Sequence, residues 1–188
     1  MKYFKKVIGE RCYLSPINLS DAAQYCEWLN DFEISKNLMV NTQMLQEENE
    51  KNILGGIIDR KDYVFAIVLK DEDKLIGNTG IHKINHIDRK CDIGIFIGDK
   101  DRLSKGYGTE AMNLTLDFAF NILNMHNVML EVFAYNKRAI RSYEKCGFKV
   151  IGSRRDSKEI CGKRHDIIFM DILREEFKSP YFEKEFNK

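Results

Sequence analysis

The sequence predicts a mixed α/β fold, with a mostly antiparallel sheet of six to seven strands, a central βαβ unit and about four helices. Short runs rich in Val, Ile and Phe at residues 63–69, 74–84 and 91–97 are separated by polar turns, which is typical of an antiparallel meander. Residues 106–124 are apolar outside a narrow polar stripe at helical spacing, so they predict a mostly buried helix. Because strand patterns flank this helix between residues 92 and 135, we expect two parallel strands joined by a right-handed crossover.

The N-terminal third predicts one strand and two helices. Residues 11–17 alternate weakly and predict the first strand. The segment 19–21 supplies an N-cap for a helix over residues 22–29. A second helix is expected over residues 43–58; its apolar positions are sparse, so we expect it at the surface, stopped or loosened at Gly55 and Gly56.

The C-terminal half completes the sheet. Residues 128–134 predict a strand, residues 136–145 a short helix with Gly147 at its C′ position, and residues 148–151 and 165–173 a closing strand pair. The polar stripe of the buried helix, expected to face water, consists of Glu110, Asn113, Asp117, Asn121 and Asn124.

Length and composition predict one globular domain. The 188 residues correspond to a single domain, expected over residues 1–173, with a tail at 174–188 that either packs on a neighbouring subunit or frays. The hydrophobic fraction of 44% excludes a disordered chain. A net charge of +1 gives no overall attraction to nucleic acid or to anionic lipid. We therefore expect neither a nucleic-acid nor a membrane partner.

The cysteines and histidines predict no metal site and no disulfide framework. The five cysteines are odd in number and never form a C-x-x-C pair, and the His and Cys spacings give only two weak ligand pairs. No apolar stretch approaches the roughly 18 residues of a membrane span, and no secretion signal follows the basic start. These features predict a cytoplasmic protein in a reducing compartment.

Two local motifs carry chemistry. The segment 104–109, with glycines at 106 and 108, connects a strand to the buried helix; free backbone amides at such a helix N-terminus suit a phosphate, or the glycines only make a tight loop. Farther along, Asn136, Ala139 and Tyr143 are spaced i, i+3, i+7 and share one helix face. By itself this pattern also fits a half-buried core tyrosine.

Together the two motifs resemble the GNAT superfamily of acetyl-CoA-dependent N-acetyltransferases, over residues 11–173. The family's Q/R-x-x-G-x-G/A loop matches at Gly106 and Gly108, but Leu103 stands at the Q/R position and the arginine is displaced to Arg102. The N-x-x-A-x-x-x-Y-x-K-x-G-F pattern matches at every fixed position from Asn136 onward. The resemblance implies acetyl-CoA as co-substrate, with no metal.

The resemblance also implies roles for individual residues. The resemblance makes Tyr143 the general acid; a phenol with a pKa of about 10 is protonated at neutral pH, so when positioned it can donate to the leaving thiolate, whose thiol has a pKa of about 8.5. Asn136 orients the cofactor, and Gly98 permits the strand before the loop to splay. The full cofactor-binding set implied in this way is Phe96, Ile97, Gly98, Leu103, Ser104, Lys105, Gly106, Tyr107, Gly108, Thr109, Asn136, Arg138 and Tyr143.

The general base stays open at this point. Asp92 occupies the strand position where many family members carry a glutamate, and its shorter side chain favours action through a water. Glu131 on the facing strand and His82, with a reference pKa of about 6.5, are alternatives. Bulk water is a further alternative if desolvation lowers the pKa of the amine.

The acceptor is narrowed only to a primary amine. Residues 11–16 and 27–31 resemble the branch that includes the ribosomal-protein N-terminal acetyltransferases RimJ and RimL, so a peptide N-terminus, a polyamine and an amino-sugar all fit. Asp31, Glu33 and Glu47 are acids in the region expected to form the acceptor pocket, where they would attract a cationic amine or serve only as surface charge.

Three further points concern the activity, the basic residues near the C-terminus and the oligomeric state. Leu103 and the lack of an obvious glutamate base leave room for a non-catalytic CoA-binding or regulatory module on the same fold. Basic residues at 154–155 and 163–164 are expected to form a solvated turn rather than a patch that contacts the 3′-phosphate of the cofactor, an acidic substrate or RNA. An edge strand near the C-terminus would allow two copies to pair as a homodimer.

Overall fold

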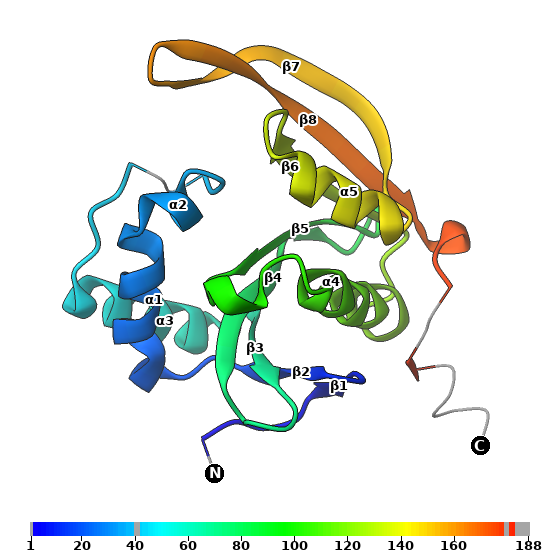
Figure 1. Cartoon of the computed structure of the whole chain (residues 1–188). Helices are drawn as coiled ribbons and strands as arrows, with labels where there is room; N and C mark the ends of the chain where they lie inside the picture. Colours follow the sequence, from blue (N-terminus) through cyan, green and yellow to red (C-terminus); the bar gives the residue numbers. More distant parts are fainter. Residues whose placement is uncertain (1, 40–41, 179–180, 183–188) are drawn as a thin grey trace.

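One mixed sheet organises the molecule (Figure 1). The computed structural model describes residues 2–39, 42–178 and 181–182. Within them the sheet has eight strands in the order β1-β2-β3-β4-β5-β6-β8-β7, antiparallel except for the β5–β6 pair. The strands are β1 (Val7–Ile8), β2 (Cys12–Pro16), β3 (Tyr63–Leu69), β4 (Leu75–Asn85), β5 (Lys90–Ile97), β6 (Asn127–Phe133), β7 (Lys149–Ile160) and β8 (Lys163–Leu173).

The predicted fold class is confirmed, with one more strand than expected. The additional strand is the two-residue β1, which is too short to produce a recognisable alternation. The helices of the described chain are α1 (Ala22–Asn30), α2 (Phe32–Ser35), α3 (Glu47–Arg60), α4 (Tyr107–Asp117) and α5 (Lys137–Lys145). Short 3₁₀ turns lie at Leu19–Asp21, Lys100–Arg102 and Arg174–Glu176, and a π-helical turn, Phe118–Ile122, extends α4.

The sheet separates two hydrophobic layers. Alternation along β2 and β3 sends Tyr13, Ala66 and Val68 toward α1 and α3, and Leu14 and Ile67 toward α4, as the period of two requires. In Figure 1 the blue and cyan helices α1–α3 lie apart from α4 and α5. Because helices cover both faces, most of the central strands are buried on both sides.

The parallel strands β5 and β6 separate after a short contact. They pair only at Lys90–Asp92 against Asn127–Met129, and each strand then continues without the other. Such a divergence leaves an opening at the edge of the paired region, which is where ligands bind in open α/β sheets.

The closing hairpin is longer than expected. Strands β7 and β8 span twelve and eleven residues, and Figure 1 shows the hairpin extending beyond the rest of the sheet. Cys161 and Gly162, both at positive φ, form the connecting turn, as a two-residue hairpin turn requires. Arg154 and Arg155 therefore lie within β7, and the prediction of a solvated turn at these residues was wrong.

Two predictions about helices were also wrong. α3 runs without interruption through Gly55 and Gly56, because the residues on both sides hold the helix and a single glycine lowers helix stability only modestly. The polar stripe of α4 does not face water throughout, since Glu110 and Asp117 are buried. Gly147, at φ +98°, ends α5 in the expected left-handed conformation.

The described part of the tail packs on its own chain. The ring of Phe177 lies 5.3 Å from that of Phe120, and the Tyr181 backbone N–H donates to Asp117 Oδ2 at 3.2 Å. Pro180 and Phe186 lie outside the described residues. No helix in the described residues is long and apolar enough to cross a membrane.

Candidate active site

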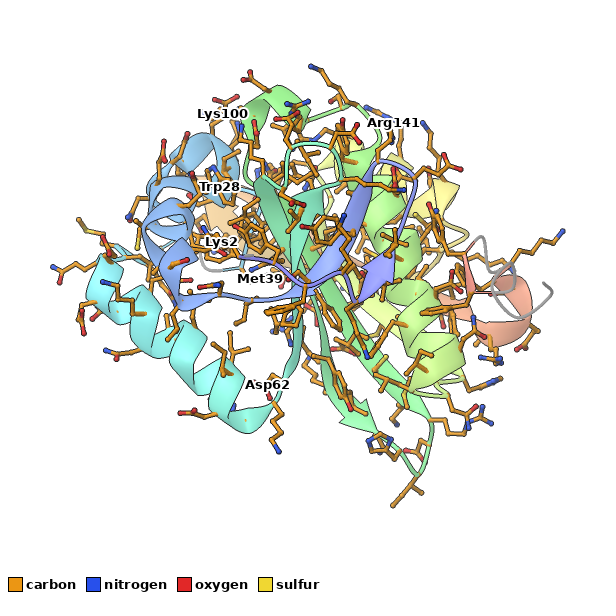
Figure 2. All side chains as sticks on the ribbon, turned by 90° about the horizontal axis from the view of Figure 1, so that it is seen from below. Lys2, Trp28, Met39, Asp62, Lys100 and Arg141 are labelled. Carbon is orange, nitrogen blue, oxygen red and sulfur yellow. The ribbon has the colours of Figure 1, made fainter. Side chains whose placement is uncertain are left out.

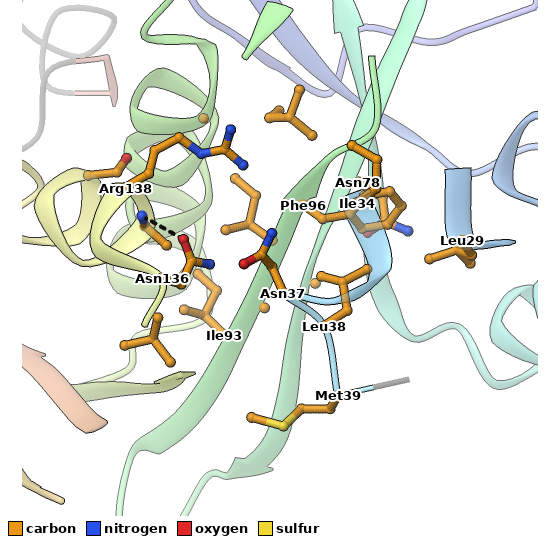
Figure 3. A pocket seen from close by; sticks show the side chains of 18 of the residues that line it. Leu29, Ile34, Asn37, Leu38, Met39, Asn78, Ile93, Phe96, Asn136 and Arg138 are labelled. Atoms are coloured by element: carbon orange, nitrogen blue, oxygen red, sulfur yellow. Dashed lines mark hydrogen bonds between the residues drawn. The ribbon is translucent and has the colours of Figure 1, made fainter. Parts of the chain in front are cut away.

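A cavity of about 790 Å³ lies at the divergence of β5 and β6. Its floor includes β4 and β5, and Figure 3 shows Ile93 and Phe96 between two sides of different character. We call one side the polar wall: Leu103, Ser104, Gly106, Gly108, Thr109, Asn136, Arg138, Ala139, Arg141, Ser142, Tyr143 and Lys145. We call the other the apolar wall: Leu29, Ile34, Asn37, Leu38, Met39, Gln43, Leu45, Glu50, Ile53, Leu54, Ile57 and Val64.

The N-terminus of α4 supplies unpaired amides to the polar wall. Gly106 is the N-cap residue at φ +87°, a conformation that favours glycine, and no side chain caps the helix. The first backbone bond of the helix runs from Glu110 N to Gly106 O, at 3.0 Å, so the amides before it have no acceptor within the helix. Free amides and the positive end of the helix dipole suit a phosphate at this position.

An ion pair between the buried Glu110 and the exposed Arg11 anchors this loop to β2. Glu110 is 8% exposed; its Oε1 accepts the backbone N–H of Arg11 at 2.8 Å and of Cys12 at 3.2 Å, and its Oε2 accepts Arg11 Nε at 3.0 Å. The same guanidinium donates to Lys105 O at 2.9 Å and lies 4.6 Å from the centre of the Tyr107 ring. The pair fixes the loop that presents the amides, and sequence reasoning missed both residues.

Helix α5 is tied to the same loop. Asn136 Oδ1 accepts the Ala139 backbone N–H at 3.2 Å and so caps the helix, the contact dashed in Figure 3. Thr109 Oγ1 and Ser142 Oγ lie 2.8 Å apart and share a hydrogen bond. These contacts place both predicted motifs on one wall, and Asn136 Nδ2 has no partner among the described residues.

Tyr143 lines the cavity from α5. Its ring is half-buried and meets Phe148 at 6.0 Å between centroids, and its hydroxyl has no hydrogen-bond partner in the described part of the chain. Burial, with a smaller contribution from the charge of Cys146, raises the pKa of Tyr143 to about 12. The phenol therefore stays protonated at neutral pH and is available as a proton donor.

Gly98 does not lie where the strands separate, contrary to the expectation from the sequence. The divergence begins after Asp92, before the chain reaches Gly98. A Cβ on Gly98 would meet the Trp28 ring at 2.1 Å, and its N–H donates to Ile76 O at 2.9 Å, so the glycine lets α1 pack against the strand end. Figure 2 shows Trp28 between α1 and the sheet. Phe96 and Ile97 do line the cavity.

The remaining residues predicted to bind the cofactor from the loop fall into two groups, one that lines the cavity and one that does not. Ser104, Gly106, Gly108, Thr109 and Leu103 line the cavity, whereas Lys105 and Tyr107 face Arg11 outside it. Arg102 and Arg138 also line it. The Arg102 guanidinium, displaced by one position from the family's Q/R position, donates to Glu72 Oε1 at 2.8 Å.

The three base candidates have different surroundings. Asp92 does not line the cavity, and its Oδ2 lies 2.6 Å from Lys83 Nζ in an ion pair. Glu131 lines the cavity and lies 4.0 Å from the same ammonium.

His82 also lines the cavity, and its ring lies over Gly80 and Gly94, which are paired across β4 and β5. A Cβ on Gly80 would stand 2.6 Å from His82 Nε2, so the glycine leaves the space that the ring occupies. Desolvation lowers the pKa of this imidazole from its ordinary 6.5 and outweighs the charges of Asp62 and Asp92, which raise it. His82 is therefore neutral at pH 7.

The three acids expected near the acceptor are paired outside the cavity. Lys100 Nζ lies 2.5 Å from Asp31 Oδ2 and 2.7 Å from Glu33 Oε2, and this contact lowers the pKa of Asp31. Glu47 pairs with Lys51 at 2.8 Å. On the apolar wall, the acid that lines the cavity is Glu50. Helical spacing places Glu50 on one face with Leu54 and Ile57, but only the packing of α3 shows that this face lines the cavity.

Comparison with known proteins identifies the family. The family model described as "Acetyltransferase (GNAT) domain" matches residues 11–149. The chain belongs to the GNAT acetyltransferase family. As a GNAT acetyltransferase it is an acyltransferase enzyme, and its relatives carry the names of N-acetyltransferases.

Two relatives and one solved structure illustrate the similarity. "Uncharacterized N-acetyltransferase p20" of Bacillus licheniformis is 25% identical over 171 residues, 89% of this chain and 96% of the relative. Spermidine N(1)-acetyltransferase of Vibrio cholerae is 34% identical over 111 residues, 58% of this chain and 64% of that enzyme. The crystal structure of spermidine N-acetyltransferase from Vibrio cholerae with CoA and spermine has a TM-score of 0.79 and 24% identity, and covers 89% of this chain and 98% of that one.

The polar wall of this GNAT acetyltransferase fits acetyl-CoA, which the fold binds. Unpaired amides at the α4 N-terminus match a pyrophosphate, and the divergence of β5 and β6 leaves room for an extended chain between the strands. No group of three or more His, Cys, Asp or Glu side chains is placed to hold a metal ion within the described residues.

Proposed function

We propose that this protein transfers the acetyl group of acetyl-CoA to the primary amine of a small cationic acceptor, by direct attack in a ternary complex. The observation that carries the proposal is the Tyr143 hydroxyl, protonated and without a protein partner, on the same wall as the unpaired amides of α4. The cavity thus holds both a set of backbone N–H groups that can bind an anion and a hydroxyl that can donate a proton.

Acetyl-CoA supplies the activated acetyl thioester. In this proposal the amides of residues 104–109 bind the pyrophosphate, and Asn136 Nδ2 orients the pantetheine arm. Backbone groups at Phe96 and Ile97 line the path of the thioester. Tyr143 donates its Oη proton to the thiolate sulfur as the carbon–sulfur bond breaks.

His82 is the base that the surroundings favour. It is neutral at pH 7, it lines the cavity, and its ring is held over the two paired glycines. Asp92 is the weaker candidate because Lys83 neutralises it outside the cavity. Burial in the cavity also lowers the pKa of the attacking amine, because it disfavours the charged form, so this amine gives up its proton to His82 more readily.

The acceptor proposed here is a polyamine. The Vibrio cholerae relative of 34% identity is named for spermidine. A peptide N-terminus is the second candidate, supported by the resemblance of residues 11–16 and 27–31 to the RimJ/RimL branch. An amino-sugar is a third, but the many aliphatic side chains of the apolar wall favour a methylene chain over a hydroxylated ring.

Calorimetric titration with acetyl-CoA, followed by a thiol-release screen, tests the proposal. The screen compares polyamines, amino-sugars and peptides with free N-termini. Micromolar binding with thiol release on polyamines supports the proposal, and release only on peptides supports the second candidate. Binding without turnover on any amine contradicts it and favours a non-catalytic CoA-binding module.

Assembly and location are further parts of the proposal. β7 is an edge strand with Val150 and Ile151 exposed, so pairing of this edge between two copies would give a homodimer. Light scattering of the purified protein tests this. All five cysteines are free thiols, which fits the reducing cytoplasm.

A further inference from the structure

Glu50 is a mostly buried acid on the apolar wall of the cavity. It lies on α3 and is 5% exposed, yet it lines the cavity. Ile53, Leu54 and Ile57 of the same helix line the cavity with it. Acids are seldom buried unless a partner compensates their charge, so the position calls for an explanation.

The described residues supply no such partner. No hydrogen bond or ion pair reaches the Glu50 carboxylate from them, and the nearby Lys51 is paired with Glu47. Burial alone raises the pKa of Glu50. Burial raises the pKa values of the nearby Tyr25 phenol and Cys26 thiol, and the charge of Glu50 adds to this, so these neighbours of Glu50 are neutral groups.

We propose that Glu50 determines acceptor specificity by pairing with a cationic group of the acceptor other than the amine that is acetylated. The inference rests on the proposed function and extends it. Its substrate class is an amine with two or more ammonium groups separated by an apolar chain. The methylene chain of the acceptor lies along the apolar wall. Its non-reacting ammonium supplies the positive partner that the Glu50 carboxylate does not have in the free protein.

Charge logic assigns Glu50 to the non-reacting group. A carboxylate beside the attacking amine would stabilise its ammonium form and so remove the lone pair that attacks the thioester. Glu50 lies on the wall formed by α3, whereas Tyr143 lies on the wall formed by α5. Figure 3 shows the sides separated by β5, with Asn136 and Arg138 on one and Leu29 and Leu38 on the other.

The test compares Glu50→Gln with Glu48→Gln. Glu48 is exposed on the same helix and does not line the cavity, so it is the matched control. The acceptors are spermidine and nonylamine, which have similar chain length but differ in the number of charges. We expect Glu50→Gln to lower kcat/KM for spermidine about 10- to 100-fold, mainly through KM, and to leave nonylamine unchanged. Glu48→Gln should match the unaltered protein with both acceptors.

Each outcome bears on one proposal. Equal kcat/KM of Glu50→Gln and the unaltered protein for spermidine overturns the role of Glu50, and indicates a carboxyl that is neutral in the complex. A parallel loss with both acceptors also overturns it, because the effect would not depend on the second charge. Failure of the unaltered protein to acetylate any amine counts instead against the proposed function.

Calorimetry and melting keep the test independent of turnover. Spermidine binding to the unaltered protein, weakened about tenfold or more in Glu50→Gln, supports the subsite even if transfer is absent. The melting temperature of Glu50→Gln should equal or exceed that of the unaltered protein, since the change removes an uncompensated buried charge. A lower melting temperature would mean that Glu50 has a structural partner, and this would contradict the proposal.

Discussion

The two walls of the cavity differ in how they recognise a ligand. The polar wall presents backbone amides at the start of α4 and is braced by Arg11, Glu110 and the Thr109–Ser142 contact. The apolar wall is built from aliphatic side chains on α1, α2 and α3, on the segment between α2 and α3 and on β3, with Glu50 among them. One wall suits a group common to every reaction of the family, and the other suits the acceptor of this enzyme.

The contrast shows why the first wall has a sequence motif and the second does not. A pyrophosphate is recognised by backbone amides, which need only a left-handed glycine and a helix start. An acceptor is recognised by side chains, and many combinations of aliphatic residues make an apolar surface of the same kind. Substitutions in the two walls should therefore have separable effects.

The largest expected effect is that of Tyr143→Phe on the polar wall. Loss of the general acid should lower kcat about 10²- to 10⁴-fold, because the thiolate then leaves without a proton. Steady-state thiol release measures kcat, and calorimetry should show acetyl-CoA affinity within about threefold of the unaltered protein. Since burial holds the pKa of Tyr143 near 12, ionisation of this phenol should cause no loss of kcat between pH 7 and pH 10. An unchanged kcat in the variant would remove Tyr143 from the mechanism.

His82→Gln should lower kcat about 10²-fold, the low end for a lost general base. The active form is the neutral imidazole, and the pKa of His82 is lowered from 6.5, so the rate of the unaltered enzyme should fall as pH drops through a value below 6.5. This acid limb of the kcat–pH profile should be absent in His82→Gln. Glu131→Gln is the control and should keep the acid limb. If the acid limb is absent in Glu131→Gln and present in His82→Gln, the general base is Glu131.

Glu110→Ala should weaken the polar wall by releasing its anchor. Truncation leaves the backbone amides of Arg11 and Cys12 without their acceptor, at a cost of about 2–4 kcal/mol in the free energy of unfolding. The KM for acetyl-CoA should rise as the loop loses its fixed position, while the KM for the amine changes little. Urea unfolding and kinetics measure both. Asn113→Ala on the same helix is the control, with a change within about 0.5 kcal/mol.

The smallest effect, Gly55→Ala, concerns the helix that bears the apolar wall. A Cβ at Gly55 meets only Leu19 Cδ2, at 4.0 Å, so alanine fits and should stabilise the protein by about 0.5–1 kcal/mol. Kinetic constants should stay unchanged. Gly147→Ala is the contrasting variant, because φ +98° disfavours a side chain, and it should destabilise. A loss of stability in Gly55→Ala would show that α3 needs its glycines.

The sequence could predict those parts of the site that lie within one short segment, but not those that depend on contacts between distant segments. Positions 104–109 and 136–148 form short continuous segments, so their spacing predicted both the helix N-terminus and the face that carries Tyr143. Glu110 was expected in water, because its contacts with Arg11 and Cys12 join residues far apart in the chain. Asp92 was selected by strand position, but the sequence could not show that Lys83 pairs with it.

The sequence by itself determined the fold class, the family and the loop and helix that form the polar wall, because these follow from periodicity and from short motifs. Only the tertiary structure decided which acids line the cavity. Lys100 forms ion pairs with Asp31 and Glu33 outside the cavity, whereas the packing of α3 places Glu50 on the cavity wall. The physical reason is that a charge acts according to its burial and its neighbours, and both are set when distant segments pack together.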